Sequence, residues 1–548
     1  MNNQYLSKTL AVAVAMACAG NVSAISLSTF NEADTANQLT LRISGSSAHD
    51  KGLMQLLRLT AAGGAEICAA NTLDVYTSGT SDTTPGNDTI YFCTAGADSG
   101  FAAGTKRLAI IKRSGGGSGT GVGGLIKAGT VALDDGTSIN SNFLNPTNAT
   151  VVAAAGVAQA ASGNFSGFTM HKGISSSLTV ASATGADVGI SDEEPNIFKK
   201  IFNPDLKNSE MAALTVKGIS GVIFGVPVTR GIYERLQAVE FATTNVCNPN
   251  NASYGNITNA ASNANLDACM PSLSRAQLQG LYTGNIGDWA QLTSSHTDGL
   301  NVATATTPDY STALVDTQIY LERRVSSSGT QKAFEIYFTA EGCLDGAQSF
   351  LTTSATVVQN SSGSTIPTNL KTHDTAGRGA LGVLSSELVV DVTGVTDSTT
   401  GAGKWRFIKV NGAAPTVLNA VKGSYDLFYE STLQYRNATV NTLAALSVAK
   451  KAVADAIGAK LGLPNVVNDL NVAFTQTYGR GGLLGNAVDN AADAPVAPYV
   501  AISAASVAPV LAHDVYAKPI ALSTRGASGA VNACLAPVTV LDSQASSQ

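Results

Sequence analysis

Two arginines run directly into small hydroxyl-bearing residues in the segment RRVSSSGTQKAF, residues 323–334. Phe334 and Phe338 have the i, i+4 spacing of a helix with one buried face, so we expect a helix after the glycine. Its first turn would present hydroxyls and unpaired N–H groups, which with the helix dipole favour a bound anion. An ordinary helix cap is the alternative, because Ser328 and Gln331 have capping-box spacing. The motif alone leaves both interpretations open.

Three further segments place small polar residues directly after a predicted strand. They are GSSA (45–48), RSGGGSGTG (113–121) and GISD (189–192). Open α/β sheets bind ligands at the carboxyl ends of their strands, so donors from several such turns can meet there. The glycine-rich turn lacks the G-x-x-x-x-G-K-[ST] pattern of a nucleotide-binding loop. By composition alone it also fits a flexible surface loop.

Asp192 is an acid placed where an anion is expected. A carboxylate repels an anion, but it accepts a hydrogen bond from a protonated oxyanion such as hydrogen phosphate. A fully deprotonated ion such as sulfate offers no proton. The structural alternative is a helix N-terminus with an acidic first turn, since the run continues Glu193-Glu194-Pro195.

The N-terminus has the features of a secretory signal peptide over residues 1–24. Lys8 supplies the positive region, residues 9–20 are apolar, and Val22-Ser23-Ala24 resembles a cleavage site. Lipidation at Cys18 is an alternative that the preceding residues fit poorly. No later apolar run is long enough to span a bilayer. We therefore expect a soluble periplasmic, secreted or cell-surface protein.

Composition limits the classes of partner. The 33 basic residues are outnumbered by 39 acidic ones, which argues against nucleic acid. An anion would have to be captured by local geometry, because the overall field repels it. The chain of 548 residues is long enough for two or more domains.

Six cysteines follow the signal peptide, and an even number in an exported chain predicts disulfides. Proximity in the sequence favours three pairs: Cys68 with Cys93, Cys247 with Cys269, and Cys343 with Cys534. Other pairings of the six stay open. No C-x-x-C or matching histidine spacing predicts a metal site.

Enzyme signatures are missing from the sequence. It contains neither a G-x-S-x-G elbow nor an H-E-x-x-H helix, and its five histidines are scattered, most of them expected at the surface. We therefore expect no catalysis and no cofactor.

The order of these motifs resembles that of the phosphate-binding proteins of bacterial phosphate ABC importers, in the type II periplasmic binding protein superfamily. LSRAQLQGLYTGNIGDW (273–289) and RVSSSGTQKAF (324–334) carry most of the resemblance, which spans roughly residues 39 to 390. It implies an α/β fold of two hinged lobes that close over a buried anion. It also implies a monomer that delivers phosphate, or a related oxyanion, to an ABC importer in the membrane.

The resemblance implies specific binding residues. Arg324 would pair with the ligand's oxygens, and Asp192 would accept its proton. Hydroxyl and backbone donors would come from Ser328, Gly329 and Thr330, from Ser46 and Ser47, and from Ser114 or Ser118.

The predicted organisation follows from the same comparison. Lobe 1 would span 25–225 with an insertion at about 70–105, lobe 2 would span 226–385, and 386–440 would return to lobe 1. The extension 441–548 opens with a predicted amphipathic helix, and its role is unknown.

Some features depart from the family. Ser326 stands where the family has an aspartate, and Ala48-His49 stands where it has Thr-Phe. The length of the chain and its Ala-, Gly-, Ser- and Asn-rich insertions support an alternative: a secreted or surface structural or adhesion protein built on the same fold.

Overall fold

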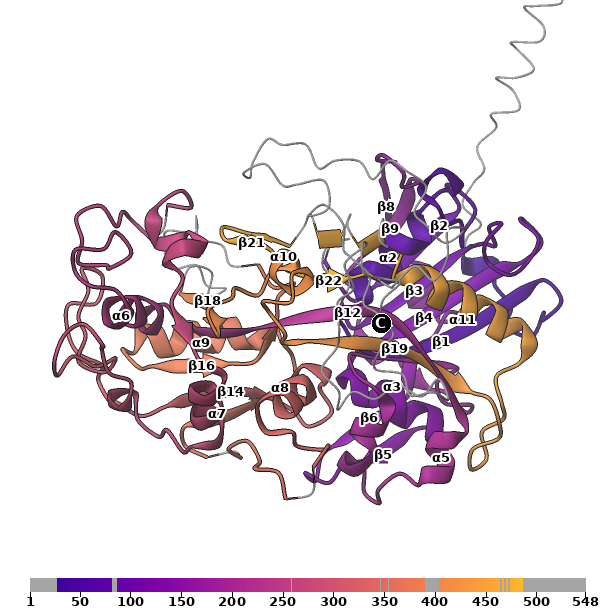
Figure 1. Ribbon diagram of the computed structural model, residues 1–548. Helices are drawn as coiled ribbons and strands as arrows, with labels where there is room; N and C mark the ends of the chain where they lie inside the picture. Colours follow the sequence, from indigo (N-terminus) through magenta and orange to yellow (C-terminus); the bar gives the residue numbers. More distant parts are fainter. Residues whose placement is uncertain are drawn as a thin grey trace, which may run out of the picture.

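Two lobes lie side by side and are joined by two long strands (Figure 1). The computed structural model describes residues 27–80, 86–257, 259–344, 346–352, 354–389, 404–463, 466–467, 470–471 and 474–485. The predicted signal peptide, Cys18 and Cys534 lie outside these residues. The arrangement confirms the predicted α/β fold of two lobes.

Lobe 1 is built on a twisted mixed sheet. In order across the sheet, its strands are β8 (Gly156–Gln159), β9 (Phe168–His171), β2 (Leu73–Thr77), β3 (Asp88–Thr94), β4 (Arg107–Arg113), β1 (Gln38–Gly45) and β11 (Val188–Ser191). β4, β1 and β11 are parallel, so their carboxyl ends meet at one edge. The insertion expected at 70–105 is therefore more than a loop, because β2 and β3 extend the sheet. The helices of lobe 1 are α2 (Asp50–Arg58), α3 (Gly117–Ile126), α4 (Ala149–Val152) and α5 (Asn208–Ala212).

Lobe 2 has a smaller sheet. Its strands are β15 (Val357–Asn360), β14 (Tyr320–Arg324), β16 (Ala380–Gly382), β17 (Leu384–Ser385), β18 (Trp405–Val410) and β13 (Ser272–Leu273). Its helices are α6 (Arg230–Glu240), α7 (Arg275–Thr283), α8 (Gly329–Thr339), α9 (Thr365–Thr375) and α10 (Val417–Val421). β14 and β15 are parallel, so the turns that follow them are neighbours.

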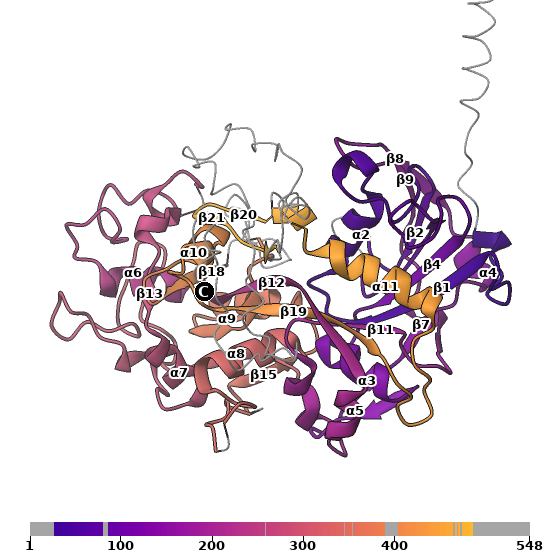
Figure 2. The same cartoon turned by 45° about the vertical axis from the view of Figure 1, so that its right-hand side comes forward.

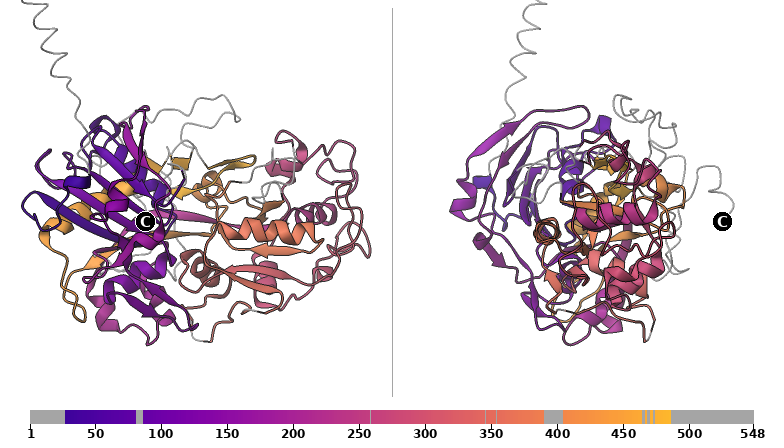
Figure 3. Two further views of the ribbon diagram at one scale, coloured as in Figure 1. Left: turned by 180° about the vertical axis from the view of Figure 1, so that it is seen from behind. Right: turned by 90° about the vertical axis from the view of Figure 1, so that its left-hand side faces the viewer.

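The two lobes share strands β12 (Leu214–Thr229) and β19 (Phe428–Arg436). The first half of β12 pairs with β19, whereas its second half pairs with β16, β17 and β18. Seen from behind, in the left-hand view of Figure 3, these strands run between the lobes. A single strand running through both sheets is a natural place for a hinge.

The C-terminal extension begins as part of lobe 1. Helix α11 (Val448–Leu461) confirms the predicted helix and packs against α2 and β12, with Val453, Ile457 and Leu461 buried (Figure 2). Lys450 forms an ion pair of 2.8 Å with Asp187 of lobe 1. Within the described residues, the extension is thus a structural part of the first lobe.

Short elements complete the described chain. The strands are β5 (Thr130–Ala132), β6 (Ser138–Asn140), β7 (Asn142–Leu144), β10 (Thr179–Ala181), β20 (Thr475–Gln476), β21 (Gly479–Arg480) and β22 (Leu483–Leu484). Single 3-10 segments lie at Leu27–Thr29, Ala61–Gly63, Ser176–Leu178, Pro195–Ile201, Asn263–Asn265, Asp267–Cys269 and Trp289–Gln291. None of the helices in the described part of the chain combines the length and apolarity needed to cross a membrane.

Disulfides stabilise the excursions of both lobes. Cys68–Cys93 and Cys247–Cys269 are formed, which confirms two of the predicted pairs. The third pair includes Cys534, which lies outside the described residues. Closing these loops lowers the entropy of the unfolded chain, by about 3 kcal/mol for loops of this order of length.

The interior of lobe 2 is aromatic. Tyr282 stacks on Phe350 with ring centroids 4.7 Å apart and meets Phe334 edge-on at 5.7 Å. Helix α7 starts at Ser274, whose hydroxyl accepts a bond from the Gln277 N–H, and it ends at Gly284 in the left-handed region. These contacts hold α7 and α8 together, so the start of α8 is fixed relative to β14.

The expectation that most histidines lie at the surface is wrong for His49 and His373, both of which are buried. Within the described structure, neither ring nitrogen of His49 has a hydrogen-bond partner. Burial, followed by the charge of Lys112, lowers the pKa of His49 to about 3. This position therefore holds a buried, neutral histidine.

This burial predicts sensitivity to acid. The unfolded histidine binds a proton near its usual pKa of about 6.5, so the contribution of His49 is present above that pH and is lost as the pH falls toward about 3. We expect His49→Phe to reduce the loss of stability over this range, which for one group is at most about 1.4 kcal/mol per pH unit. Thermal unfolding from about pH 7.5 down to about pH 4 checks it. The exposed His296→Phe serves as the control, and an unchanged acid loss in His49→Phe would contradict the prediction.

Candidate oxyanion-binding site

A cavity of about 490 Å³ lies between the lobes, and it gathers residues from several strand ends. Ser47 and Asp192 follow β1 and β11 of lobe 1, and Arg324 ends β14 of lobe 2. Thr330 adds the first turn of α8. The cavity therefore lies where the carboxyl ends of the parallel strands of the two lobes face each other, as open α/β sheets predict.

Arg324 is a buried cation in the wall of this cavity, with an exposed fraction of 8%. Its Nε and Nη2 donate to the carbonyl oxygens of Asn360 and Ser361, at 3.3 and 3.2 Å. It forms no ion pair of 4.0 Å or less with any residue that the structure describes. Burial lowers the pKa of Arg324 to about 10, against the opposing effect of Asp192, so it stays charged at neutral pH. Burying such a charge without an ionic partner is costly, and an anion in the cavity would offset that cost.

Asp192 lines the same cavity, and its negative charge opposes the lowering of the Arg324 pKa by burial. The Ser46 hydroxyl donates to Oδ1, and the Asp192 N–H donates to Ser118 Oγ at 3.0 Å. Burial raises the pKa of Asp192, although these hydroxyls and Arg324 act in the opposite direction. A raised pKa makes the carboxylate a better acceptor for an acidic proton, which is the property that hydrogen phosphate requires.

The two lobes touch beside the cavity. The Gly119 N–H, at the start of α3, donates to the Ser327 carbonyl at 2.8 Å. Ser326 donates through its hydroxyl to Asp135 of lobe 1 at 3.0 Å. The structure therefore has the lobes in contact, and Ser326 takes part in that contact.

The predicted binding residues lie at different depths. Ser47, Asp192, Arg324 and Thr330 line the cavity. Ser46 and Ser118 lie one contact behind it, bonded to Asp192, and Gly329 lies against both Asp192 and Ser118. Ligand binding by these residues stays a prediction.

Two predicted hydroxyls have other partners. Ser328 caps α8, with its Oγ 3.5 Å from the Gln331 N–H, as the cap interpretation expected. Ser114 accepts from Lys112 Nζ at 2.9 Å and donates to Asp50. Ser114 thereby stabilises a buried ion pair instead of lining the cavity.

That ion pair, Lys112 with Asp50 at 2.9 Å, was not predicted. Lys112 Nζ also donates to the carbonyls of Gly45 and Ser46, at 2.9 and 3.0 Å. It thereby holds the turn after β1 in place below Asp192. A lysine inside an apolar strand at 106–112 was a visible signal, because such a charge needs a buried partner.

The turn after β15 was also missed. Ser362, Gly363 and Ser364 line the cavity beside Arg324. Their pattern, small residues directly after a strand, is the same one that identified the other turns.

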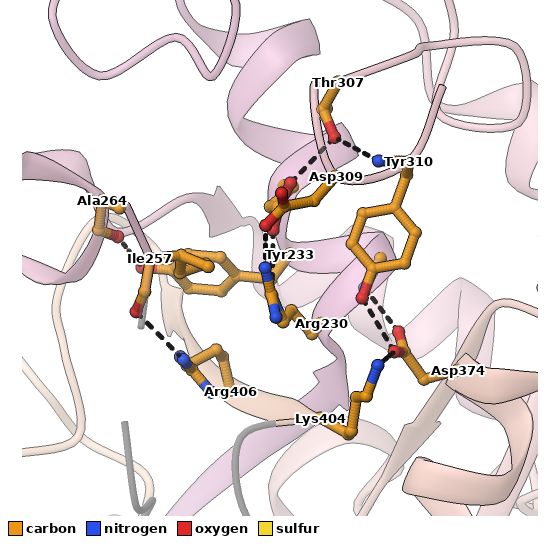
Figure 4. Close-up of polar contacts among 12 residues, drawn as sticks. Arg230, Tyr233, Ile257, Ala264, Thr307, Asp309, Tyr310, Asp374, Lys404 and Arg406 are labelled. Carbon is orange, nitrogen blue, oxygen red and sulfur yellow. Dashed lines mark hydrogen bonds and ion pairs between the residues drawn. The ribbon is translucent and has the colours of Figure 1, made fainter. Parts of the chain in front are cut away.

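A second polar cavity, of about 420 Å³, lies in lobe 2 near the first turn of α6 (Figure 4). Asp374 accepts from Tyr310 and from the Gly231 N–H, both at 2.7 Å, and Lys404 lies 3.7 Å from it. Arg230 pairs with Glu234 at 3.0 Å and with Asp309. These charges are already paired with each other, so this cavity has no unmet charge comparable with Arg324.

Metal binding receives no support from the described residues, where no group of three or more His, Cys, Asp or Glu side chains could hold an ion.

No family model and no curated protein matches the chain. Several solved structures are similar to it at low identity. A Clostridium perfringens protein described as a putative phosphate ABC transporter substrate-binding protein, with bound phosphate, is 18% identical, with a TM-score of 0.29, over 52% of this chain and 77% of its own. An ancestral soluble variant of the human phosphate binding protein is 13% identical, with a TM-score of 0.34, over 80% and 89%. PfluDING, a periplasmic phosphate-binding protein, is 12% identical, with a TM-score of 0.31, over 81% and 99%. At these values the similarities identify no ligand for this chain.

The close approach at Gly329 generates a prediction about closure. A Cβ there would lie 2.4 Å from both Asp192 Oδ2 and Ser118 Oγ, too close for contact. Gly329→Ala should therefore hold the lobes apart and weaken phosphate binding by about tenfold or more, because overpacking costs about 1–3 kcal/mol. Titration calorimetry with phosphate measures the change. Gly287→Ala is the matched control, because the nearest atom to a Cβ there would be the Gly284 carbonyl oxygen, 3.8 Å away. Equal affinity of the two variants would contradict the predicted contact.

Proposed function

We propose that this chain is an exported solute-binding protein that captures phosphate, or a similar tetrahedral oxyanion, between two closing lobes for ABC-type uptake. The proposal rests on Arg324, a buried cation without an ion-pair partner, in the wall of a cavity that it shares with Asp192. Three parts of the sequence converge there: the strand-end turns of lobe 1, the start of α8 and the arginine itself. The role is one of binding without catalysis.

The energetics of this arrangement are sufficient for a receptor. Each hydrogen bond to a charged group contributes about 1.5–3 kcal/mol, and micromolar binding requires about 8 kcal/mol after the costs of association. A small oxyanion must lose most of its water to enter the cavity. Donors from both lobes would replace that water, which is why closure and binding belong together.

Removing the cation tests the proposal most directly. Phosphate should raise the unfolding temperature of the wild-type protein, in proportion to RT ln(1 + [L]/Kd). Arg324→Ala should abolish this shift while the protein stays folded, because it removes the buried guanidinium group in the wall of the cavity. The neighbouring Arg323→Ala is the matched control, since Arg323 pairs with Glu335 at 3.1 Å. A phosphate shift that survives in Arg324→Ala would remove this residue from the site. No shift with phosphate, arsenate or sulfate in the wild type would favour the structural alternative.

Selectivity tests the role of Asp192. An ionised carboxylate accepts the proton of hydrogen phosphate but repels sulfate, whereas an amide can donate to either ion. Asp192→Asn should therefore bind sulfate more tightly relative to phosphate than the wild type does. Competition calorimetry with the two anions measures the ratio. If Asp192→Asn keeps the wild-type ratio of sulfate to phosphate binding, Asp192 does not accept a hydrogen bond from the proton of the ligand.

A further inference from the structure

The cavity is much larger than an inorganic oxyanion requires. Its volume of about 490 Å³ compares with about 30 Å³ for one water molecule, and a phosphate ion fills the space of only a few waters. Cavities of this size are typical of small organic ligands. The walls beyond Arg324 and Asp192 therefore need an explanation.

One of these walls is apolar. Leu384 and Leu388 line the cavity and stand beside the arginine. A Cβ on Gly363 would lie 3.2 Å from Arg324 Nη1, 3.9 Å from Leu388 and 4.0 Å from Leu384. Leu384 is already buried, with an exposed fraction of 1%, whereas Leu388 is partly exposed. Inorganic phosphate has no apolar atoms to cover Leu388, whereas an alkyl group attached to the phosphoryl group does.

A second acid lies in the same wall. Glu387 lines the cavity, is half-buried, and accepts a hydrogen bond from the Ser385 hydroxyl at 3.3 Å. It has no ion pair of 4.0 Å or less with any residue that the structure describes. Glu387 precedes Leu388 in the chain and lines the cavity together with Asp192 and Arg324. A carboxylate in this place repels an inorganic anion and attracts a cation.

The charged groups around Glu387 are Lys51, Asp192 and Asp50. Lys51 also lines the cavity, and its Nζ lies 4.8 Å from the centre of the Phe474 ring. Asp50 is already paired with Lys112. Burial raises the pKa of Glu387 to about 7, with Lys51 opposing the two aspartates, so Glu387 ionises near neutral pH.

We propose that the cavity takes a small organic phosphate or phosphonate that carries a protonated amine. The phosphoryl oxygens would face Arg324, the carbon chain would cover Leu388, and the ammonium group would pair with Glu387. This proposal rests on the proposed function, because it places the phosphoryl group at the same site, beside Arg324 and Asp192. It adds the class of ligand.

Binding of matched compounds tests the proposal. Phosphoethanolamine and ethyl phosphate share the phosphoryl group and the carbon chain, and they differ in the amine. Calorimetry of the full chain at about pH 8, where Glu387 is mostly ionised, should show tighter binding of phosphoethanolamine. Glu387→Gln should weaken phosphoethanolamine by about tenfold or more and should leave ethyl phosphate unchanged or tighter, because only the ammonium ion loses its partner. The exposed Glu32→Gln is the matched control for a lost negative charge.

The outcomes separate this inference from the proposed function. Binding of inorganic phosphate without either organic compound, or equal effects of Glu387→Gln on both compounds, would overturn the amine-bearing ligand and leave the oxyanion receptor standing. No binding of any phosphate compound would overturn both. Binding to vesicles of phosphatidylethanolamine without binding of free phosphoethanolamine would also overturn the small-molecule ligand.

Discussion

The charge of Arg324 is the constraint on which the candidate site depends. It is buried at the end of β14, bonded to two backbone carbonyls, and has no ionic partner among the described residues. A folded chain tolerates such a charge when the surrounding structure holds it and a ligand can complete its environment. By contrast, the charged residues that line the cavity near α6 are paired: Arg230 with Glu234 and Asp309, and Lys404 with Asp374. The difference between the cavities lies in the pairing of their charges.

The construction of the two lobes explains how this charge meets its counterparts. Parallel strands place the turns after β1, β4 and β11 at one edge of lobe 1, and the turns after β14 and β15 at one edge of lobe 2. The shared strands β12 and β19 turn these edges toward each other. Contacts such as Gly119 with Ser327 then close the gap through backbone groups, which require glycine for close approach.

Two acidic residues, Asp192 and Glu387, line the cavity together with Arg324. Asp192 sits beside the cation, where its raised pKa suits a ligand that carries a proton. Glu387 precedes Leu388 in the same wall. A receptor for a bare anion gains nothing from the second acid, so its position extends the chemistry of the site from an ion to a small molecule. The Lys112–Asp50 pair belongs to the scaffold, since it anchors the turn that carries Ser46.

The sequence by itself determined the two-lobed α/β class, the two disulfides with closely spaced cysteines, the helices α7, α8 and α11, and the grouping of Arg324 with Asp192. The helices and the disulfides follow from local spacing, because caps, apolar periodicity and close cysteines lie in neighbouring parts of the chain. The two-lobed class and the grouping of Arg324 with Asp192 were implied by the resemblance to phosphate-binding proteins. Only the tertiary structure decided that Ser328 and Ser114 serve a cap and an ion pair, and that residues 70–105 add strands to the sheet. It also decided that Glu387 and the leucines share the cavity with the arginine. Such juxtapositions join residues far apart in the chain, and their burial depends on packing that no local pattern contains.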